Sequence, residues 1–347
     1  MIEEIEEYSF KIGTQKIRLS LEELRDSNYI SNLLSDIIAG EEAWAKLDKI
    51  TQLDVIEKLI QKLVDLKINP DARNRDGYTP LYVAIQNGNI EIAELLIKCG
   101  TNIDDNYERS RTPLHIAIGR KQLEIAKLLV KSGANVNAKT KNHGKDNLTP
   151  MHFAVFADTP EFIELLSSNG AIINERESVE GYTPLHLAAL YGNKNIIQTL
   201  VDKGQNIEDV DNNGRTALFL AIRQCTEAEN DSRIEVIKYL IGSLKADITT
   251  KDNNNNTVLF PAANNCHEEV VKLIIEQYIK IFGKDQLKSF IDYKNKDGMD
   301  ALDIALNSEN EGAIGVLRSY GADIGSVGSV LNEVKSEKAI LQTKGKA

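Results

Sequence analysis

The sequence predicts an all-α solenoid, in which similar helix pairs stack one on the next, and three observations carry this prediction. A tetrapeptide that begins with Thr recurs along the chain, and the distance from Thr79 to Thr112 gives a base period of 33 residues. Each clear copy is followed by an amphipathic run that ends in Gly. The 347 residues are 42% hydrophobic and 27% charged, which is enough apolar material for an extended core.

The tetrapeptide is predicted to begin the first helix of each repeat. Its Thr side chain can accept a hydrogen bond from a backbone N–H of the first turn, and Pro at the next position has no N–H to leave unpaired. The four clear copies are Thr79-Pro80-Leu81-Tyr82, Thr112-Pro113-Leu114-His115, Thr149-Pro150-Met151-His152 and Thr183-Pro184-Leu185-His186. Three weaker copies keep the register but lack the Pro, namely Thr216-Ala217-Leu218-Phe219, Thr257-Val258-Leu259-Phe260 and Asp300-Ala301-Leu302-Asp303.

The amphipathic runs predict a second helix in each repeat, with apolar side chains at roughly i, i+3 and i+4 on the buried face. They extend over residues 90–100, 123–133, 160–170 and 195–204, and each ends at a Gly that can take the left-handed conformation of a helix terminus. Asp-Gly or Asn-Gly pairs precede several tetrapeptides, as at Asp76-Gly77, and predict a hairpin turn. Each repeat is therefore expected to be helix, helix and hairpin loop.

These features together resemble the ankyrin repeat. The resemblance is carried by the Thr-Pro-Leu-His copies, the Ala-rich positions after them such as Ala188-Ala189, and the segment Gly133-Ala134-Asn135-Val136-Asn137. It covers about residues 41–325 and implies an ankyrin-repeat solenoid. We expect a degenerate capping repeat over residues 41–72, seven repeats over 73–325 and a flexible tail over 326–347. Longer spacings late in the chain indicate insertions near residues 225–233 and 278–292.

Residues 1–40 predict a small β-β-α segment. Tyr8–Ile12 and Lys16–Leu19 alternate in polarity around a Gly-Thr turn, and Ser20-Leu21-Glu22-Glu23 has the pattern of a capping box. With the residues that follow, this segment resembles the opening of the POZ (BTB) fold. The alternative is an extension of the cap, because the ankyrin-like region begins before a complete domain of that family could end.

Charge and cysteine content exclude several classes of protein. The net charge of −11 disfavours non-specific binding to nucleic acid, and no apolar stretch approaches the ~20 residues that membrane insertion requires. Cys99, Cys225 and Cys266 are too widely spaced for a disulfide framework or a CxxC metal knuckle. We therefore expect a protein of a reducing compartment, located in the cytoplasm.

No pattern in the sequence indicates an enzyme, a cofactor or a metal. The segment from Asp209 to Gly214 matches the start of a calcium loop, but Leu220 stands where the bidentate Glu is needed. Cys225 and Cys266-His267 lack a fourth zinc ligand. The sequence contains no H-E-x-x-H, G-x-S-x-G or Gly-rich phosphate loop.

Three repeat histidines are predicted to be structural. His115, His152 and His186 occupy the same position of successive repeats, so stacking places them in a row rather than around one ion. We expect each ring to hydrogen-bond the backbone of the loop in an adjacent repeat.

The resemblance implies a concave groove, made of loop tips and first helices, that binds partner proteins. Aromatic and Arg side chains at such positions are typical of binding hot spots. The repeat register places these candidate contact residues in the groove: Arg75, Tyr78, Arg109, Arg111, Arg120, Leu148, Phe156, Tyr182, Tyr191, Arg215 and Arg223. The sequence thus predicts a non-enzymatic interaction scaffold for a protein partner with an acidic or mixed-charge segment.

Two other functions remain open at this point. A POZ-like front would favour an adaptor that dimerises or presents a bound protein to a ubiquitin ligase. The abundance of Asn, Lys and Ile suits an A/T-rich genome and favours a bacterial or viral effector, which an intracellular bacterium would deliver into its host cell.

Overall fold

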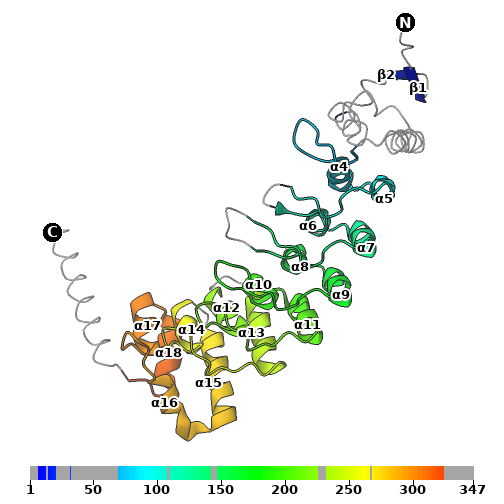
Figure 1. Cartoon of the computed structure of the whole chain (residues 1–347). Helices are drawn as coiled ribbons and strands as arrows, with labels where there is room; N and C mark the ends of the chain where they lie inside the picture. Colours follow the sequence, from blue (N-terminus) through cyan, green and yellow to red (C-terminus); the bar gives the residue numbers. More distant parts are fainter. Residues whose placement is uncertain are drawn as a thin grey trace, which may run out of the picture. The chain divides into compact units, whose positions relative to one another are not determined.

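The computed structural model describes residues 7–12, 15–20, 32, 69–107, 110–141, 147–225, 232–265 and 268–323 (Figure 1). The chain divides into two compact units, unit 1 from Met1 to Ile172 and unit 2 from Ile173 to Ala347. The predicted cap up to residue 68, the tail over 326–347 and the helix expected after Ser20 lie outside the described residues.

Unit 1 contains three helix pairs in its described part. They are α4 (Pro80–Gln86) with α5 (Ile90–Lys98), α6 (Pro113–Gly119) with α7 (Leu123–Lys131), and α8 (Pro150–Ala157) with α9 (Pro160–Ser168). First helices pack in one layer, α4 on α6 and α6 on α8, and second helices pack in another, α5 on α7 and α7 on α9 (Figure 1).

Unit 2 contains four helix pairs in its described part. They are α10 (Pro184–Tyr191) with α11 (Lys194–Asp202), α12 (Ala217–Arg223) with α13 (Ser232–Gly242), α14 (Leu259–Asn265) with α15 (Glu268–Phe282), and α17 (Ala301–Ser308) with α18 (Glu311–Ser319). The first helices α10, α12, α14 and α17 contact one another in that order. A 3-10 turn, η2 (Lys284–Gln286), and α16 (Leu287–Ile291) form an insertion after α15, within the range expected from the spacing.

An antiparallel hairpin precedes these helices. Strand β1 (Glu7–Ile12) pairs with β2 (Gln15–Ser20), with Glu7 opposite Ser20 and Ile12 opposite Gln15. The hairpin expected near the start of the sequence is therefore present. Together with the helix pairs it confirms an all-α repeat solenoid with a small β segment at the front.

The Thr positions begin helices as the sequence predicts. Thr79 Oγ1 accepts from the Tyr82 N–H at 3.3 Å and Thr216 Oγ1 from the Phe219 N–H at 3.3 Å. In the seventh copy Asp300 takes the same role, because its Oδ1 accepts from the backbone N–H three residues on at 2.9 Å. A polar side chain before the first turn therefore supplies the acceptor that these backbone donors need.

The sixth copy departs from the pattern, since α14 begins at Leu259, one residue later than the register predicts. In the fifth copy the Leu220 N–H donates to the Thr216 carbonyl at 3.1 Å, but Pro261 occupies the matching position of the sixth and has no N–H. The Phe260 N–H binds the Thr257 carbonyl instead, at 3.1 Å, and Thr257 Oγ1 is buried without a hydrogen bond.

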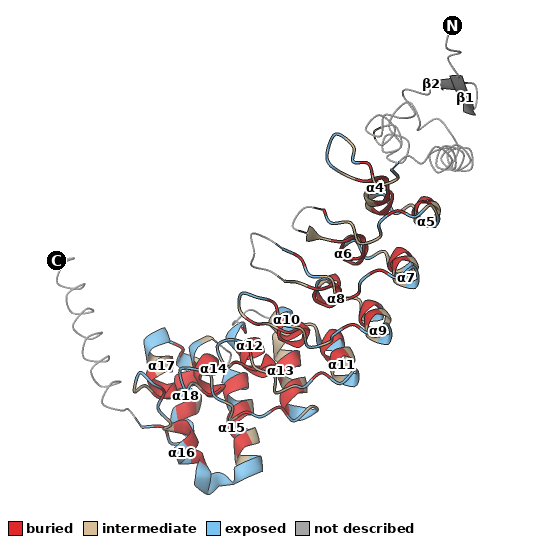
Figure 2. Cartoon of the chain, in the orientation of Figure 1, coloured by how far each residue is buried: buried red, intermediate tan, exposed pale blue. Residues whose placement is uncertain are grey.

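The core lies between the two layers of helices, and buried residues, drawn red in Figure 2, lie on the facing sides of each pair. Leu114 and Leu129 in unit 1 and Leu200 in unit 2 are fully buried. The second helices α5, α7, α9 and α11 are each followed by a glycine with left-handed backbone, for example Gly133 with φ 94° and Gly204 with φ 93°. A β-carbon is disfavoured at such φ values, which is why each run ends there in Gly.

The loops between repeats are turns closed by backbone hydrogen bonds, and none of the described loop residues forms a strand. In the loop before α12, the Asp211 N–H donates to the Arg215 carbonyl at 2.9 Å and the Gly214 N–H to the Asp211 carbonyl at 3.1 Å. The predicted hairpin loops are thus present as tight turns without extended arms.

A second set of contacts joins neighbouring repeats at the ends of the second helices. The Asp71 carboxylate accepts from the Asn102 N–H at 3.0 Å, and Asp104, 33 residues later than Asp71, accepts from the Asn135 N–H at 3.0 Å. In unit 2, Glu208 Oε1 accepts from the Asp247 N–H at 2.8 Å. These side chains fix the separation of adjacent repeats, and the sequence analysis did not find them.

Candidate partner-binding surfaces

Aromatic side chains cluster beside the loops at the start of unit 1. The Tyr78 ring stacks on Tyr82, with centroids 4.3 Å apart and planes 11° apart, and Tyr82 contacts Tyr107 at 4.3 Å. Tyr107 is buried, its hydroxyl hydrogen-bonds Thr79 Oγ1, and burial raises the pKa of this phenol. Only the half-buried rings of Tyr78 and Tyr82 therefore offer surface to a partner.

The second cluster of unit 1 combines a cation with apolar area. The Arg111 guanidinium lies 5.5 Å from the centroid of the Phe153 ring, which contacts the Phe156 ring edge to face at 6.1 Å. Phe156 is 43% exposed and Arg120 is exposed, while Arg111 is half-buried. We call Arg111, Arg120, Phe153 and Phe156 the Arg–Phe surface. The sequence analysis found three of these residues and missed Phe153, which follows the repeat histidine rather than a loop.

His115 and His186 have the structural role that the sequence predicts. His115 Nδ1 accepts from the Thr112 N–H at 3.1 Å, so the proton sits on Nε2, which donates to the Leu148 carbonyl in the next repeat at 3.2 Å. His186 is held in the same way and reaches the Arg215 carbonyl at 3.0 Å. Leu148, a predicted contact residue, thus uses its carbonyl inside the stack, and its side chain is half-buried.

These buried rings predict a loss of stability in acid. Burial lowers the pKa of the His115 imidazole from 6.5 to about 4, and burial also lowers the pKa of His186. The unfolded chain therefore takes up protons near pH 6.5 while the folded chain does not. The stabilisation of the folded chain by its neutral histidines is complete above pH 6.5. Between pH 7 and pH 5, the contribution of His115 alone should lower the free energy of unfolding by about 2 kcal/mol.

Urea unfolding at pH 7 and pH 5 measures this loss. A His115→Gln variant is the control, because it should lower stability at both values yet remove that part of the pH dependence. Asp71, Glu208 and Asp300 have pKa values raised by burial, which favours the folded state as pH falls, so the comparison of the two proteins isolates the histidine. Equal pH dependence in both proteins would contradict the assignment.

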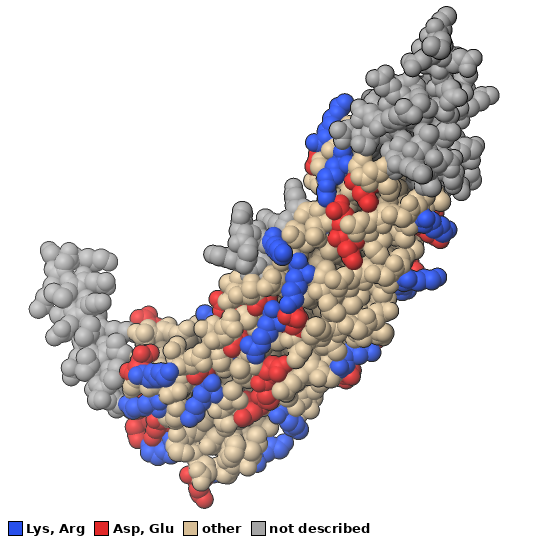
Figure 3. Space-filling model, viewed as in Figure 1, with Lys and Arg blue, Asp and Glu red and all other residues tan. Residues whose placement is uncertain are grey.

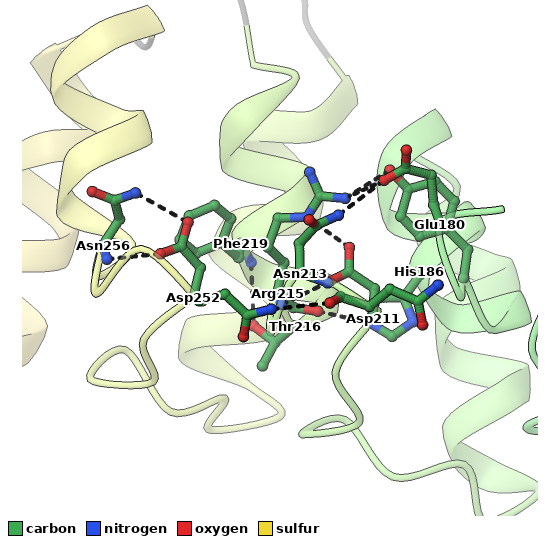
Figure 4. A network of polar contacts seen from close by, with 12 residues as sticks. Glu180, His186, Asp211, Asn213, Arg215, Thr216, Phe219, Asp252 and Asn256 are labelled. Atoms are coloured by element: carbon green, nitrogen blue, oxygen red, sulfur yellow. Dashed lines mark hydrogen bonds and ion pairs between the residues drawn. The ribbon is translucent and has the colours of Figure 1, made fainter. Parts of the chain in front are cut away.

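Arg215 in unit 2 does not lie on an exposed surface, contrary to the sequence prediction. Its side chain is 7% exposed, with Nε 2.6 Å from Asp211 Oδ2 and Nη2 2.8 Å from Glu180 Oε2 (Figure 4). The same Nη2 donates to the Tyr182 hydroxyl at 3.2 Å. Its charge is compensated inside the unit because Asp211, in the same loop, and Glu180, in the preceding one, converge on it. Arg215 therefore joins the loop before α12 to the loop before α10, and Tyr182 stays half-buried beside it.

The calcium-like segment is explained by the same contacts. Asp211 Oδ1 accepts from the N–H groups of Asn213 and Arg215 at 2.8 and 2.9 Å, and its Oδ2 binds the Arg215 side chain. Its oxygens are used within the loop. Across the described parts of the chain, no group of three or more His, Cys, Asp or Glu side chains is arranged to hold a metal ion.

A cavity of about 510 Å³ lies in unit 2 beside α12, α14 and α17. Its wall contains Arg223, a predicted contact residue that is exposed, and Asn264 and Asn265 at the end of α14. The latter two occupy the seventh and eighth positions after Thr257, the same register that selected Arg223, but the sequence analysis did not include them.

Three predicted contact residues remain. Arg75 is exposed in unit 1, and Tyr191 is 51% exposed at the end of α10 in unit 2. Arg109 lies outside the described residues. The predicted set is therefore divided, with one group on each unit.

Comparison with known proteins identifies the repeats. A family model described as ankyrin repeats (3 copies) matches residues 49–140, 151–252 and 225–327. A second family model, described as ankyrin repeats (many copies), matches residues 114–167. The chain belongs to the ankyrin-repeat family. The ankyrin matches begin within the predicted cap and leave residues 1–40 outside them.

Individual relatives agree with the ankyrin assignment. An ankyrin repeat-containing protein of Schizosaccharomyces pombe is 34% identical over 73 residues, which is 21% of this chain and 30% of that protein. The human ASB11 ankyrin repeat domain superposes with a TM-score of 0.56 and 22% identity, covering 71% of this chain and 100% of the domain. The ankyrin repeat domain of Bcl-3 gives a TM-score of 0.58 and 21% identity, covering 71% and 97%. These structures share the fold with this ankyrin-repeat chain.

Proposed function

We propose that this chain is a non-enzymatic scaffold that binds a partner protein through exposed aromatic and Arg side chains on its ankyrin repeats. Ankyrin repeats are protein–protein interaction modules, and the Arg–Phe surface carries the proposal for this chain. It combines a half-exposed ring, a stacked guanidinium and a second exposed Arg on one pair of adjacent repeats. Such groups bury much area with few rotatable bonds and are enriched in hot spots.

The charges of the molecule suit a partner segment of acidic or mixed character. Among the described residues, groups of Lys and Arg and groups of Asp and Glu are both present on the face shown in Figure 3. Arg111 and Arg120 would pair with carboxylates of the partner, while Phe153 and Phe156 would bury its apolar side chains. None of the described helices is both long and apolar enough to span a membrane.

The test compares the intact chain with an Arg111→Ala/Phe156→Ala double variant in affinity capture from cell extract, followed by calorimetry on the captured protein. We expect Kd to rise about 30-fold or more, the equivalent of about 2 kcal/mol, with little change in melting temperature. The matched control is Lys131→Ala/Ile172→Ala, which removes an exposed cation and an exposed apolar side chain elsewhere on unit 1. Capture and Kd unchanged in the first variant would refute the surface.

The adaptor and effector alternatives stay hypotheses. The adaptor depends on residues 1–40, which lie before the ankyrin matches begin at residue 49, and the effector depends on composition alone.

A further inference from the structure

Amide side chains line the unit 2 cavity. Its volume of about 510 Å³ falls within the ~300–1,000 Å³ typical of ligand sites. Seven of its sixteen lining residues are asparagines, which come from the loops before α12, α14 and α17 and from the end of α14. An Asn side chain presents a C=O acceptor and N–H donors, which are the kinds of group that pair with the C=O and N–H of a peptide backbone. The wall therefore matches the polar groups of an extended polypeptide.

Two of these amides join neighbouring loops, and others keep polar atoms without a hydrogen-bond partner in the described chain. Asn295 Nδ2 donates to Asn256 Oδ1 at 2.9 Å, which joins the loops before α14 and α17. Within the described chain, the exposed Asn254 side chain and Asn264 Oδ1 have no hydrogen-bond partner, while Asn264 Nδ2 donates to Asn265 Oδ1 at 2.6 Å. The exposed Asn254 amide and Asn264 Oδ1 are therefore available to bind a ligand backbone at this cavity.

The cavity has one uncompensated charge of each sign. Arg223, at the end of α12, is exposed and forms no ion pair with any described residue. Asp297, in the loop before α17, is likewise exposed and unpaired in the described chain. The other two charged lining residues are satisfied, Arg215 by its two carboxylates and Asp252 by the N–H groups of Asn254 and Asn256.

The two free charges come from segments on either side of α14 in the row of first helices. Helix α14 contacts both α12, which carries Arg223, and α17, which follows Asp297. Packed helix axes are about 8–10 Å apart, so two successive packings separate the axes of α12 and α17 by up to about 16–20 Å. An extended peptide advances about 3.3 Å per residue, and it would cross this distance in about five or six residues.

We propose that this amide-lined cavity binds an extended segment of the partner protein, with an acidic side chain paired to Arg223 and a basic side chain, about five or six residues away, paired to Asp297. Charge complementarity selects this occupant. A polyanion such as nucleic acid would be repelled by Asp297, and a purely apolar segment would leave both charges and the amides unpaired. The inference rests on the proposed scaffold function and gives the partner segment a charge pattern.

The experiment selects binders from a displayed library of randomised twelve-residue peptides on the full chain. Recovered peptides should be enriched in an acidic and a basic residue five or six positions apart. Arg223→Glu should lower their affinity about tenfold or more, and replacing the acidic residue of the peptide by Lys should restore binding to that variant. Asp297→Lys should also lower the affinity, and replacing the basic residue of the peptide by Glu should restore binding to that variant.

Matched controls are Arg318→Glu and Asp285→Lys, which reverse exposed charges of unit 2 outside the cavity and should leave affinity unchanged. Circular dichroism on every variant verifies the fold. Recovery of no peptide, peptides without the charge pair, or binding indifferent to both reversals would overturn the site. Peptides that bind both reversal variants but not Arg111→Ala/Phe156→Ala would refute this cavity while supporting the proposed scaffold function.

Discussion

Replacement of Asp211 by Ala is expected to destabilise unit 2 by about 3–5 kcal/mol, because it leaves the Arg215 guanidinium buried with a single, half-exposed carboxylate. The Asp211 side chain is fully buried and Arg215 is 7% exposed, whereas Glu180 is 44% exposed. The substitution also leaves the N–H groups of Asn213 and Arg215 without their acceptor, and the loss is costly at Arg215, whose donor is buried.

Urea denaturation monitored by circular dichroism measures this loss. Glu180→Ala is the matched control, since it removes the exposed partner of the same Arg and should cost about 1 kcal/mol or less. An Asp211→Ala/Arg215→Met double variant should recover part of the stability, because it no longer buries an unpaired charge. A loss for Asp211→Ala no greater than that for Glu180→Ala would show that Arg215 is not buried in solution.

The sequence could predict the contacts that each repeat makes through its own pattern. Thr at the helix start, Gly at the helix end and His reaching the next loop all depend on residues at fixed spacing, so the periodicity locates them. The one shifted helix start also has a local cause, because Pro261 removes the donor on which the register depends. Local rules therefore explain most of the fold.

The exposure of side chains on the loops could not be predicted in this way. Arg215 and Arg223 are both arginines at groove positions of the same repeat, yet the first is buried and the second is exposed. The difference comes from Glu180, 35 residues before Arg215, which supplies a second carboxylate beside Asp211. The sequence did not predict the group of asparagines at the cavity for a similar reason, since three loops and the end of α14 bring them together.

Replacement of Leu185 by Ala is expected to cost unit 2 about 2–5 kcal/mol of stability, because it creates a cavity at a site where the side chain is 1% exposed. Each repeat packs only on its neighbours, so the loss should be local rather than uniform. Helix α10 contacts α11, α12 and α13, whereas α17 contacts α14 and α18. Amide protection should therefore fall first in α10 to α13.

Native-state hydrogen exchange read by mass spectrometry distinguishes local from global loss. Leu302→Ala, at a position in α17 that is also 1% exposed, is the matched variant at the other end of unit 2 and should lower protection in α14, α17 and α18 first. Val179→Ala, at a side chain 56% exposed, should change stability by about 0.5 kcal/mol or less. Uniform loss of protection across unit 2 in both Leu variants would mean that its four helix pairs unfold as one cooperative block, and the nearest-neighbour argument would then fail for this chain.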